Sequence, residues 1–94
     1  MAKAKAVTSY SILISPSAER DLKRLEKTNK TVFQSIDKSI IALSLEPRPP
    51  GIESIGKSAY RKRDGEYRIL YQVDDGKRHV IIYRVRDRKD VYKH

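Results

Sequence analysis

Arginine recurs along the strand-like segments in the last third of the chain, between Tyr60 and Tyr92. It stands at Arg61, Arg63, Arg68, Arg84, Arg86 and Arg88. Arginine offers planar donors that match phosphate oxygens, and it keeps its charge at any working pH. Arginines placed along β-branched and aromatic segments, with a tyrosine at the end, therefore indicate a surface that binds anions.

A small antiparallel sheet must bring these arginines together. The sequence alternates with period two from Ser58 onward, which is typical of strands with one buried face. The predicted strands cover residues 59–63, 67–74 and 79–86. They are separated by Asp64-Gly65 and by Asp74-Asp75-Gly76, and an Asp-Gly pair in such a position is a strong hairpin signal.

The first hairpin decides which arginines face each other. If the Asp64-Gly65 pair forms a two-residue turn, Arg61 lies directly opposite Arg68. Arg63 then pairs with Glu66 on the same face. Like charges opposite each other cost up to about 1 kcal/mol, so a fold that accepts the cost keeps the cluster for a bound anion. The alternative is that these arginines only solvate the open face of the sheet.

The second hairpin leaves two registers open. A two-residue turn at Asp75-Gly76 and a bulged turn that starts at Asp74 place opposite faces of the last strand inward. With either turn, the middle strand presents an aromatic and aliphatic face to the core. That face comprises Tyr67, Ile69, Tyr71 and Val73.

The first half of the chain predicts one strand and an antiparallel helical hairpin. Residues 10–15 alternate like a strand, and Ser15 followed by Pro16 is a start signal for a helix that ends near Thr28 and Asn29. A second amphipathic helix is expected over residues 30–45, up to the break at Pro47. Its apolar stripe, which we expect in the core, comprises Val32, Phe33, Ile36, Ile40 and Leu43.

Residues 46–58 are rich in proline and glycine and predict a loop. The fold class expected from this order of elements is α+β, with the N-terminal strand and a two-helix antiparallel hairpin packed on a small, mainly antiparallel sheet of about four strands. Residues 1–9 are expected to be a disordered basic tail, and residues 10–94 a single domain.

Composition narrows the class of partner. The 94 residues include 21 Lys and Arg against 12 Asp and Glu, and the resulting charge of +9 favours a polyanion. The absence of cysteine excludes a disulfide framework and a thiolate metal site, so we expect no metal, no cofactor and a cytoplasmic location. No apolar run approaches the roughly 20 residues of a membrane span.

A second group of cations lies outside the arginine strands. It comprises Lys23, Arg24, Lys27, Lys57 and Lys62. Most of these side chains fit a solvated helical face. The same face is able to contact RNA phosphates, because such contacts are additive and depend on salt.

Two motifs of the last third resemble a known family. Residues 60–71 read YRKRDGEYRILY and residues 88–92 read RKDVY. Together with the order strand, helical hairpin and three antiparallel strands, they resemble the RelE branch of the RelE/ParE toxins. The resemblance implies a toxin of a type II toxin–antitoxin pair that enters the A site of the 70S ribosome and cleaves the mRNA there. It also implies a RelB-type antitoxin as partner, in a hetero-oligomeric complex.

The resemblance assigns roles to five residues of this chain. Arg61 and Arg63 fall on two basic positions before the hairpin, which are usually lysine in the best-known members. Arg68 falls on the position expected to clamp the scissile phosphate. Arg88 falls where the leaving group is neutralised or protonated, and Tyr92 on the terminal tyrosine that orients a base or the 2′-hydroxyl. Arg84 and Arg86 have no role in this mapping beyond their charge.

The proton acceptor stays open at this level, because arginine, with a pKa above about 12, is a poor base. Tyr92, ribosomal RNA groups and water are candidates, and another branch of the family uses a Glu and His pair, for which Glu66, His79 and His94 are available. Two other functions also stay open. One is a ParE-like toxin that binds DNA gyrase without catalysis, and the other is a basic nucleic-acid-binding module.

Overall fold

The computed structural model describes residues 9–91. The predicted N-terminal tail therefore lies almost entirely outside the described residues, as do Tyr92 and His94. In chain order the elements are β1 (Ser11–Ile14), α1 (Pro16–Thr28), α2 (Lys30–Ala42), β2 (Glu53–Gly56), β3 (Ala59–Asp64), β4 (Tyr67–Asp74), β5 (His79–Asp87) and α3 (Arg88–Val91).

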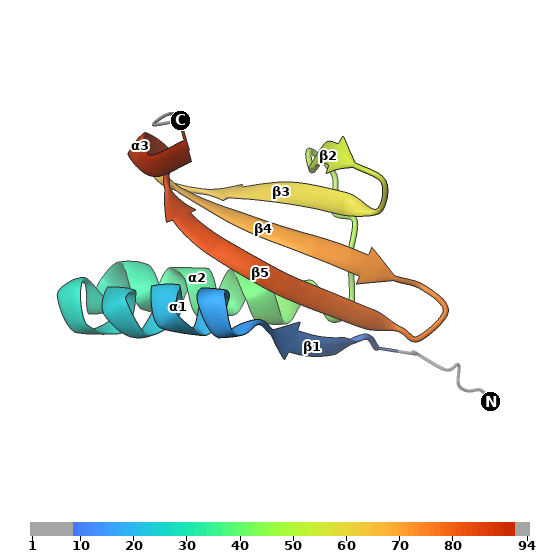
Figure 1. The fold of residues 1–94 in the computed structure, drawn as a ribbon, viewed down its shortest axis with the longest axis horizontal. Helices are drawn as coiled ribbons and strands as arrows, with labels where there is room; N and C mark the ends of the chain where they lie inside the picture. Colours follow the sequence, from blue (N-terminus) through green and yellow to red (C-terminus); the bar gives the residue numbers. More distant parts are fainter. Residues whose placement is uncertain (1–8, 92–94) are drawn as a thin grey trace.

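The strands form one sheet in the order β1-β5-β4-β3-β2. β1 runs parallel to β5, and the other neighbours are antiparallel. Helices α1 and α2 cover one face of the sheet, whereas α3 lies on the opposite side (Figure 1). The predicted α+β class is confirmed. The expected number of about four strands is wrong, because residues 53–56 of the predicted loop form a fifth strand against β3.

Local side chains fix the ends of both long helices. The Ser15 hydroxyl accepts a hydrogen bond from the backbone N–H of Ala18, as expected of a helix N-cap, and Pro16 occupies the first turn. Asn29 ends α1 and caps α2, where its side chain accepts from the N–H of Val32. α2 ends at Ala42 rather than at residue 45, because its last turn tightens and the Leu43 N–H bonds the Ile40 carbonyl.

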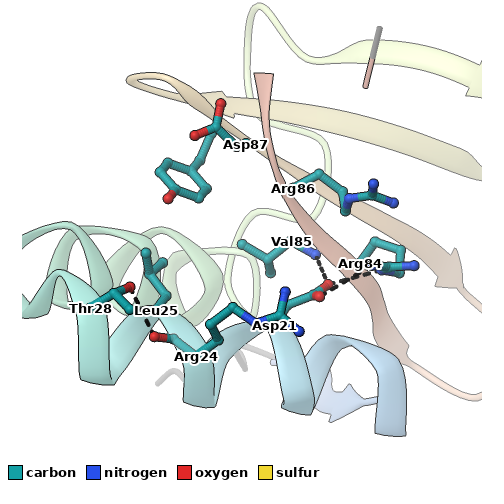
Figure 2. Close-up of a pocket in the computed structure, with 9 residues that line it drawn as sticks. Asp21, Arg24, Leu25, Thr28, Arg84, Val85, Arg86 and Asp87 are labelled. Carbon is teal, nitrogen blue, oxygen red and sulfur yellow. Dashed lines mark hydrogen bonds and ion pairs between the residues drawn. The ribbon is translucent and has the colours of Figure 1, made fainter. Parts of the chain in front are cut away.

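Beyond the end of β1, helix α1 borders the edge of β5. β1 pairs with β5 only as far as Ile82. Beyond that point the buried carboxylate of Asp21 on α1 accepts a hydrogen bond from the backbone N–H of Val85 at 2.9 Å and binds the guanidinium of Arg84 (Figure 2). A side chain thus satisfies a backbone donor that a neighbouring strand would otherwise bond.

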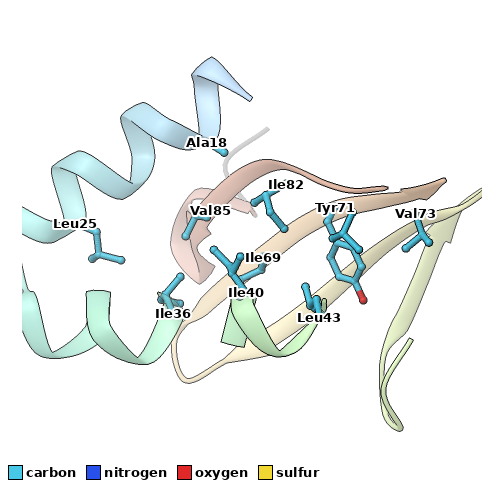
Figure 3. Packing of buried hydrophobic residues seen from close by; sticks show 11 residues of the cluster. Ala18, Leu25, Ile36, Ile40, Leu43, Ile69, Tyr71, Val73, Ile82 and Val85 are labelled. Carbon is cyan, nitrogen blue, oxygen red and sulfur yellow. The ribbon is translucent and has the colours of Figure 1, made fainter. Parts of the chain in front are cut away.

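The core lies between the two long helices and the sheet (Figure 3). Its buried members are Ala18, Leu25, Ile36, Ile40, Leu43, Ile69, Tyr71, Val73, Val80, Ile82 and Val85. Val32, Phe33 and Tyr67 pack against this cluster. The predicted inward face of the middle strand and the predicted apolar stripe of the second helix are therefore confirmed.

Neither of the two turns that the sequence left open for the second hairpin forms, and a bulge sets the register of the second half of β5. Asp74 pairs with His79 across a four-residue turn, so Val80 and Ile82 face the helices. The pairing then shifts at Tyr83, so that Val85 also faces the core. Without this extra residue, strict alternation would turn the charged side chain of residue 84 toward the helices.

No helix among residues 9–91 is long and apolar enough to cross a membrane.

Candidate functional site

The first hairpin is shifted by two residues from the predicted register. Arg63, not Arg61, pairs with Arg68, and Arg61 pairs with Leu70. The turn consists of Gly65 and Glu66, and Gly65 has φ +60°, as in hairpin turns with glycine at the first central position. The predicted Asp64-Gly65 turn is therefore wrong.

Contacts from α2 explain this register. The carboxylate of Asp64 accepts hydrogen bonds from the hydroxyls of Ser35, at 3.1 Å and 3.2 Å, and of Ser39, at 2.7 Å. These bonds hold Asp64 in β3, paired with Tyr67, and leave Gly65 to make the turn. These hydrogen bonds connect α2 to the β3–β4 hairpin, which carries the arginines.

The shift by two residues leaves the arginines on one face, because side-chain direction repeats every two residues. Arg61, Arg63 and Arg68 line a hollow of about 520 Å³ on the face opposite the helices, with Gly51, Ile52 and Glu53 from the chain leading into and forming β2. The structure thus brings together three of the five predicted catalytic residues. Like charges do face each other across β3 and β4, as the sequence predicted, although at a different pair.

Arg86 extends the group into a row across three neighbouring strands. It pairs with Arg68, so Arg63, Arg68 and Arg86 stand side by side on β3, β4 and β5. Adjacent strands lie about 4.8 Å apart, which is within reach of the oxygens of one phosphate. Sequence reasoning gave Arg86 no role, because its place opposite Arg68 depends on the bulge in β5.

Arg68, at the centre of the row, is 8% exposed. Its guanidinium donates a hydrogen bond to the carbonyl of Tyr67 at 3.2 Å. A buried charge with one neutral acceptor is strongly stabilised by a bound anion, because burial has already removed much of its hydration. Arg68 is therefore the best-placed anion ligand of the row.

Glu53 is the carboxylate of this hollow. It pairs in register with Arg61, and its two oxygens accept hydrogen bonds from the Arg61 guanidinium at 3.0 Å and 2.7 Å. The Arg61 hydrogen bonds, together with the positive charges of Arg61, Arg63 and Arg68, lower the pKa of Glu53. Sequence reasoning missed this residue, because the segment was predicted to be a loop. Glu53–Gly56 reads ESIG and has a single β-branched residue, so no local signal marked it as a strand.

Arg88 begins the short helix α3. Its backbone N–H donates to the Glu66 carbonyl at 2.7 Å, and its guanidinium lies 3.8 Å from the Glu66 carboxylate. Both contacts bring the C-terminal segment to the tip of the β3–β4 hairpin (Figure 1). The Arg86-Asp87 pair that precedes Arg88 belongs to β5, so the chain enters α3 without a glycine.

The other predicted residues are spread over the molecule. Lys62 pairs with Ile69 and lies on the helix-facing side of the sheet, away from the arginines. Lys57 stands in the turn between β2 and β3 and lines a separate hollow with Asp74 and Asp75. The three cations of the first helix are all exposed on α1. They are Lys23, Arg24 and Lys27.

Glu66 and His79 do not form a pair. Glu66 lies in the β3–β4 turn, and His79 pairs with Asp74 at the far end of β4. The length of β4, at about 3.4 Å per residue, separates them. No cluster of three or more His, Cys, Asp or Glu side chains that could hold a metal ion occurs in the described part of the chain.

Comparisons with known proteins agree with one another. Residues 12–92 match the family described as the ParE toxin of the type II toxin–antitoxin system parDE. The chain is 32% identical to the toxin RelG of Mycobacterium tuberculosis over 88 residues, which cover 89% of this chain and 97% of RelG.

Two solved structures show the same likeness in three dimensions. The first is the toxin–antitoxin complex RelBE2 from Mycobacterium tuberculosis, with a TM-score of 0.71, 26% identity, and coverage of 84% of this chain and 98% of the other. The second is the isolated E. coli RelE toxin, with a TM-score of 0.68, 27% identity, and coverage of 84% of each chain.

Proposed function

Because this chain belongs to the RelE/ParE family of toxins from type II toxin–antitoxin systems, we propose that it is an endoribonuclease that cleaves mRNA in the ribosomal A site. The observation that carries the proposal is the row Arg63, Arg68 and Arg86 on an open sheet face. A carboxylate, Glu53, lies in the same hollow. Donors for a phosphate and an acceptor for a proton are thus available together.

The reaction requires three groups. The ribose 2′-hydroxyl attacks the adjacent phosphorus, the bond to the 5′-oxygen breaks, and a 2′,3′-cyclic phosphate and a 5′-hydroxyl remain. A base must take the proton of the 2′-hydroxyl, donors must stabilise the charge on the five-coordinate phosphate, and the leaving oxygen must be neutralised. No redox step or external oxidant is involved.

Arg68 is proposed to clamp the scissile phosphate from the centre of the row, with Arg63 and Arg86 donating from the flanking strands. Arginine suits this role because its planar donors can bind two phosphate oxygens at once. Arg61 holds Glu53 through two hydrogen bonds and adds positive charge. Arg88 is proposed to neutralise the leaving oxygen, and Tyr92 to orient the 2′-hydroxyl.

Glu53 is our candidate for the proton acceptor. The neighbouring arginines lower its pKa, so its carboxylate is ionised throughout the neutral range. Arg61 occupies one side of the carboxylate, and the side chain is 56% exposed, so lone pairs remain open to a bound ribose. A weak base acts efficiently here only if the substrate is held in the reactive geometry, which the ribosome supplies. Free RNA should therefore be cut slowly.

A cognate antitoxin is the proposed second partner. Several related toxins of known structure were determined as complexes with antitoxins, among them RelBE2 from Mycobacterium tuberculosis. An acidic, amphipathic antitoxin segment would complement the +9 charge of this chain and cover the arginine face. Formation of the complex would then exclude RNA from the row.

Cell-free translation tests the function. The wild-type protein should stop synthesis and leave mRNA 5′ ends inside A-site codons. Arg63→Ala, an exposed member of the row, should reduce single-turnover cleavage by about 10²–10³-fold, and the pair Arg68→Ala with Arg88→Ala should abolish it. Arg20→Ala on α1 is the matched control, because it removes the same charge from an exposed position away from the row.

The outcomes separate the competing functions. Circular dichroism of each variant shows whether the fold survives. Arrest without new mRNA ends would contradict the nuclease. Inhibition of DNA supercoiling by gyrase, with translation intact, would support the ParE-like alternative. Equal loss of cleavage in Arg20→Ala and Arg63→Ala would mean that net charge alone accounts for the effect.

A further inference from the structure

A second cavity lies on the other side of the β5 edge, between α1 and the C-terminal half of β5. We call it the α1–β5 cleft. It measures about 370 Å³, and its polar lining comprises Asp21, Arg24, Thr28, Arg84, Arg86 and Asp87. It exists because β1 ends at Ile14, so that α1 rather than a strand borders β5 from Tyr83 onward (Figure 1).

The acidic groups of the cleft are already engaged. Asp21 accepts from Arg84 and from the Val85 N–H, and only 8% of its side chain is exposed. Asp87 accepts from the backbone N–H of Lys89 at 2.9 Å. Asp21 is thus neutralised by Arg84 within the protein. Asp87 keeps its charge, but three arginines against two aspartates leave the lining of the cleft net positive.

Two cations of the cleft remain available. Among residues 9–91, the guanidinium groups of Arg24 and Arg86 have no hydrogen-bonded or ion-paired partner. Figure 2 shows Arg24 reaching from α1 toward β5, while Arg84 and Arg86 project from the strand on the other side. Asp21 holds Arg84 in place at 2.9 Å. Guanidinium groups from two elements thus border one polar cavity, a composition that selects an anion.

Arg86 connects the cleft to the arginine row. It pairs with Arg68 on the open face of the sheet and also lines the cleft. A chain of phosphates that has one member at Arg68 can therefore continue over the edge of β5. A helix is about 10–12 Å across with its side chains, which a cavity of this volume does not hold, whereas a phosphate with its ribose fits.

We propose that the α1–β5 cleft binds a backbone phosphate of the same RNA strand, next to the phosphate held at the arginine row. The proposal rests on the function proposed above and names a subsite of that surface. Arg24 lines the cleft and is not part of the row, and unlike Arg84 it is not held by Asp21. In this arrangement, Arg24 extends the RNA contact from a single phosphate to its neighbour on the strand.

Binding of uncleavable RNA tests the subsite. The probes are 2′-O-methyl oligonucleotides, one a dinucleotide with a single phosphate and one of about eight nucleotides, a length typical of single-strand sites. Fluorescence anisotropy is recorded over a range of salt concentrations for the wild-type protein, for Arg24→Gln and for the matched control Arg20→Gln. Arg20 lies one turn earlier on α1, is exposed and does not line the cleft.

The wild-type protein should bind the longer strand more tightly than the dinucleotide. Arg24→Gln should weaken binding of the longer strand by about threefold to tenfold and reduce the slope of log K against log salt by about 0.7. It should leave dinucleotide binding unchanged, because the single phosphate of the dinucleotide is held at the row. Arg20→Gln should change the slope less than Arg24→Gln does.

Several results would overturn the subsite. They are equal effects of Arg24→Gln and Arg20→Gln, equal weakening of both probes, or no preference of the wild-type protein for the longer strand. A poly-glutamate peptide that loses more affinity than RNA in Arg24→Gln would assign the cleft to an acidic protein instead. Because these probes cannot be cut, failure of the subsite is distinct from failure of the nuclease, which cell-free translation reports.

Discussion

Tyr71 is a buried tyrosine whose ionisation should control the stability of the fold in alkali. It is 0% exposed, its hydroxyl donates to the carbonyl of Pro47 at 2.6 Å, and its ring lies 5.7 Å from that of Tyr60. Burial raises the pKa of Tyr71 from 10.0 to about 12, with a further increase from Tyr60 and an opposing effect of Arg48. The hydrogen bond also ties the segment before β2 to the core.

The size of the effect follows from this shift. A pKa that is higher in the folded state stabilises the fold fully below the unfolded value and loses that contribution as pH rises through the folded value. Two pKa units correspond to about 2.7 kcal/mol. The free energy of unfolding should therefore fall by up to that amount, mostly between about pH 10 and pH 12.

Tyr71→Phe isolates this contribution from the other groups that titrate in alkali. At about pH 8 the variant should be less stable by about 1 kcal/mol, because it leaves the Pro47 carbonyl without its donor. The wild-type protein alone then loses the Tyr71 contribution as pH rises. One pH unit above the unfolded pKa, the wild-type protein has lost about 1.4 kcal/mol of the Tyr71 contribution, which exceeds the advantage of its hydrogen bond. The free energies of unfolding of the two proteins should therefore cross near pH 11.

Urea unfolding of both proteins at a series of pH values measures the difference. Near-ultraviolet absorbance of tyrosinate provides the control, because the transition at about pH 12 should be missing from the variant. A stability difference that does not change with pH would refute the reasoning. So would a variant that is more stable than the wild-type protein at pH 8.

Two further predictions concern carboxylates. Asp21→Ala should lower the free energy of unfolding by about 3 kcal/mol, because it leaves the Val85 N–H and Arg84 without their buried acceptor. Urea unfolding measures this loss, with the exposed Asp37→Ala as control. Equal losses in the two variants would contradict the prediction. Glu53→Gln should slow single-turnover cleavage on the ribosome by about 10²–10⁴-fold while RNA binding persists. An unchanged cleavage rate would exclude Glu53 as the proton acceptor.

The candidate site was predictable only in part. The motifs over residues 60–71 and 88–92 identified Arg61, Arg63 and Arg68, which the structure places in one hollow. Period-two alternation kept them on one face even though the predicted register was wrong by two residues. Glu53 and Arg86 were missed, because the place of each depends on a strand pairing with a distant segment.

Local signals in the sequence determined the order of the elements, the cap at Ser15, the break at Asn29 and the inward face of β4. These features depend on residues within a few positions of one another, so periodicity and capping chemistry suffice to predict them. The α+β class follows from their order. The charge of +9 likewise favours a polyanion as partner without any knowledge of the fold.

Only the tertiary structure decided how these elements meet. Ser35 and Ser39 hold Asp64 across 25 to 29 residues of sequence, and this contact sets which arginines face each other. Likewise, the early end of β1 brings Asp21 to β5 over 64 residues and opens the α1–β5 cleft. Such contacts form between segments far apart in the chain, and their energies depend on the packed fold, so no local pattern encodes them.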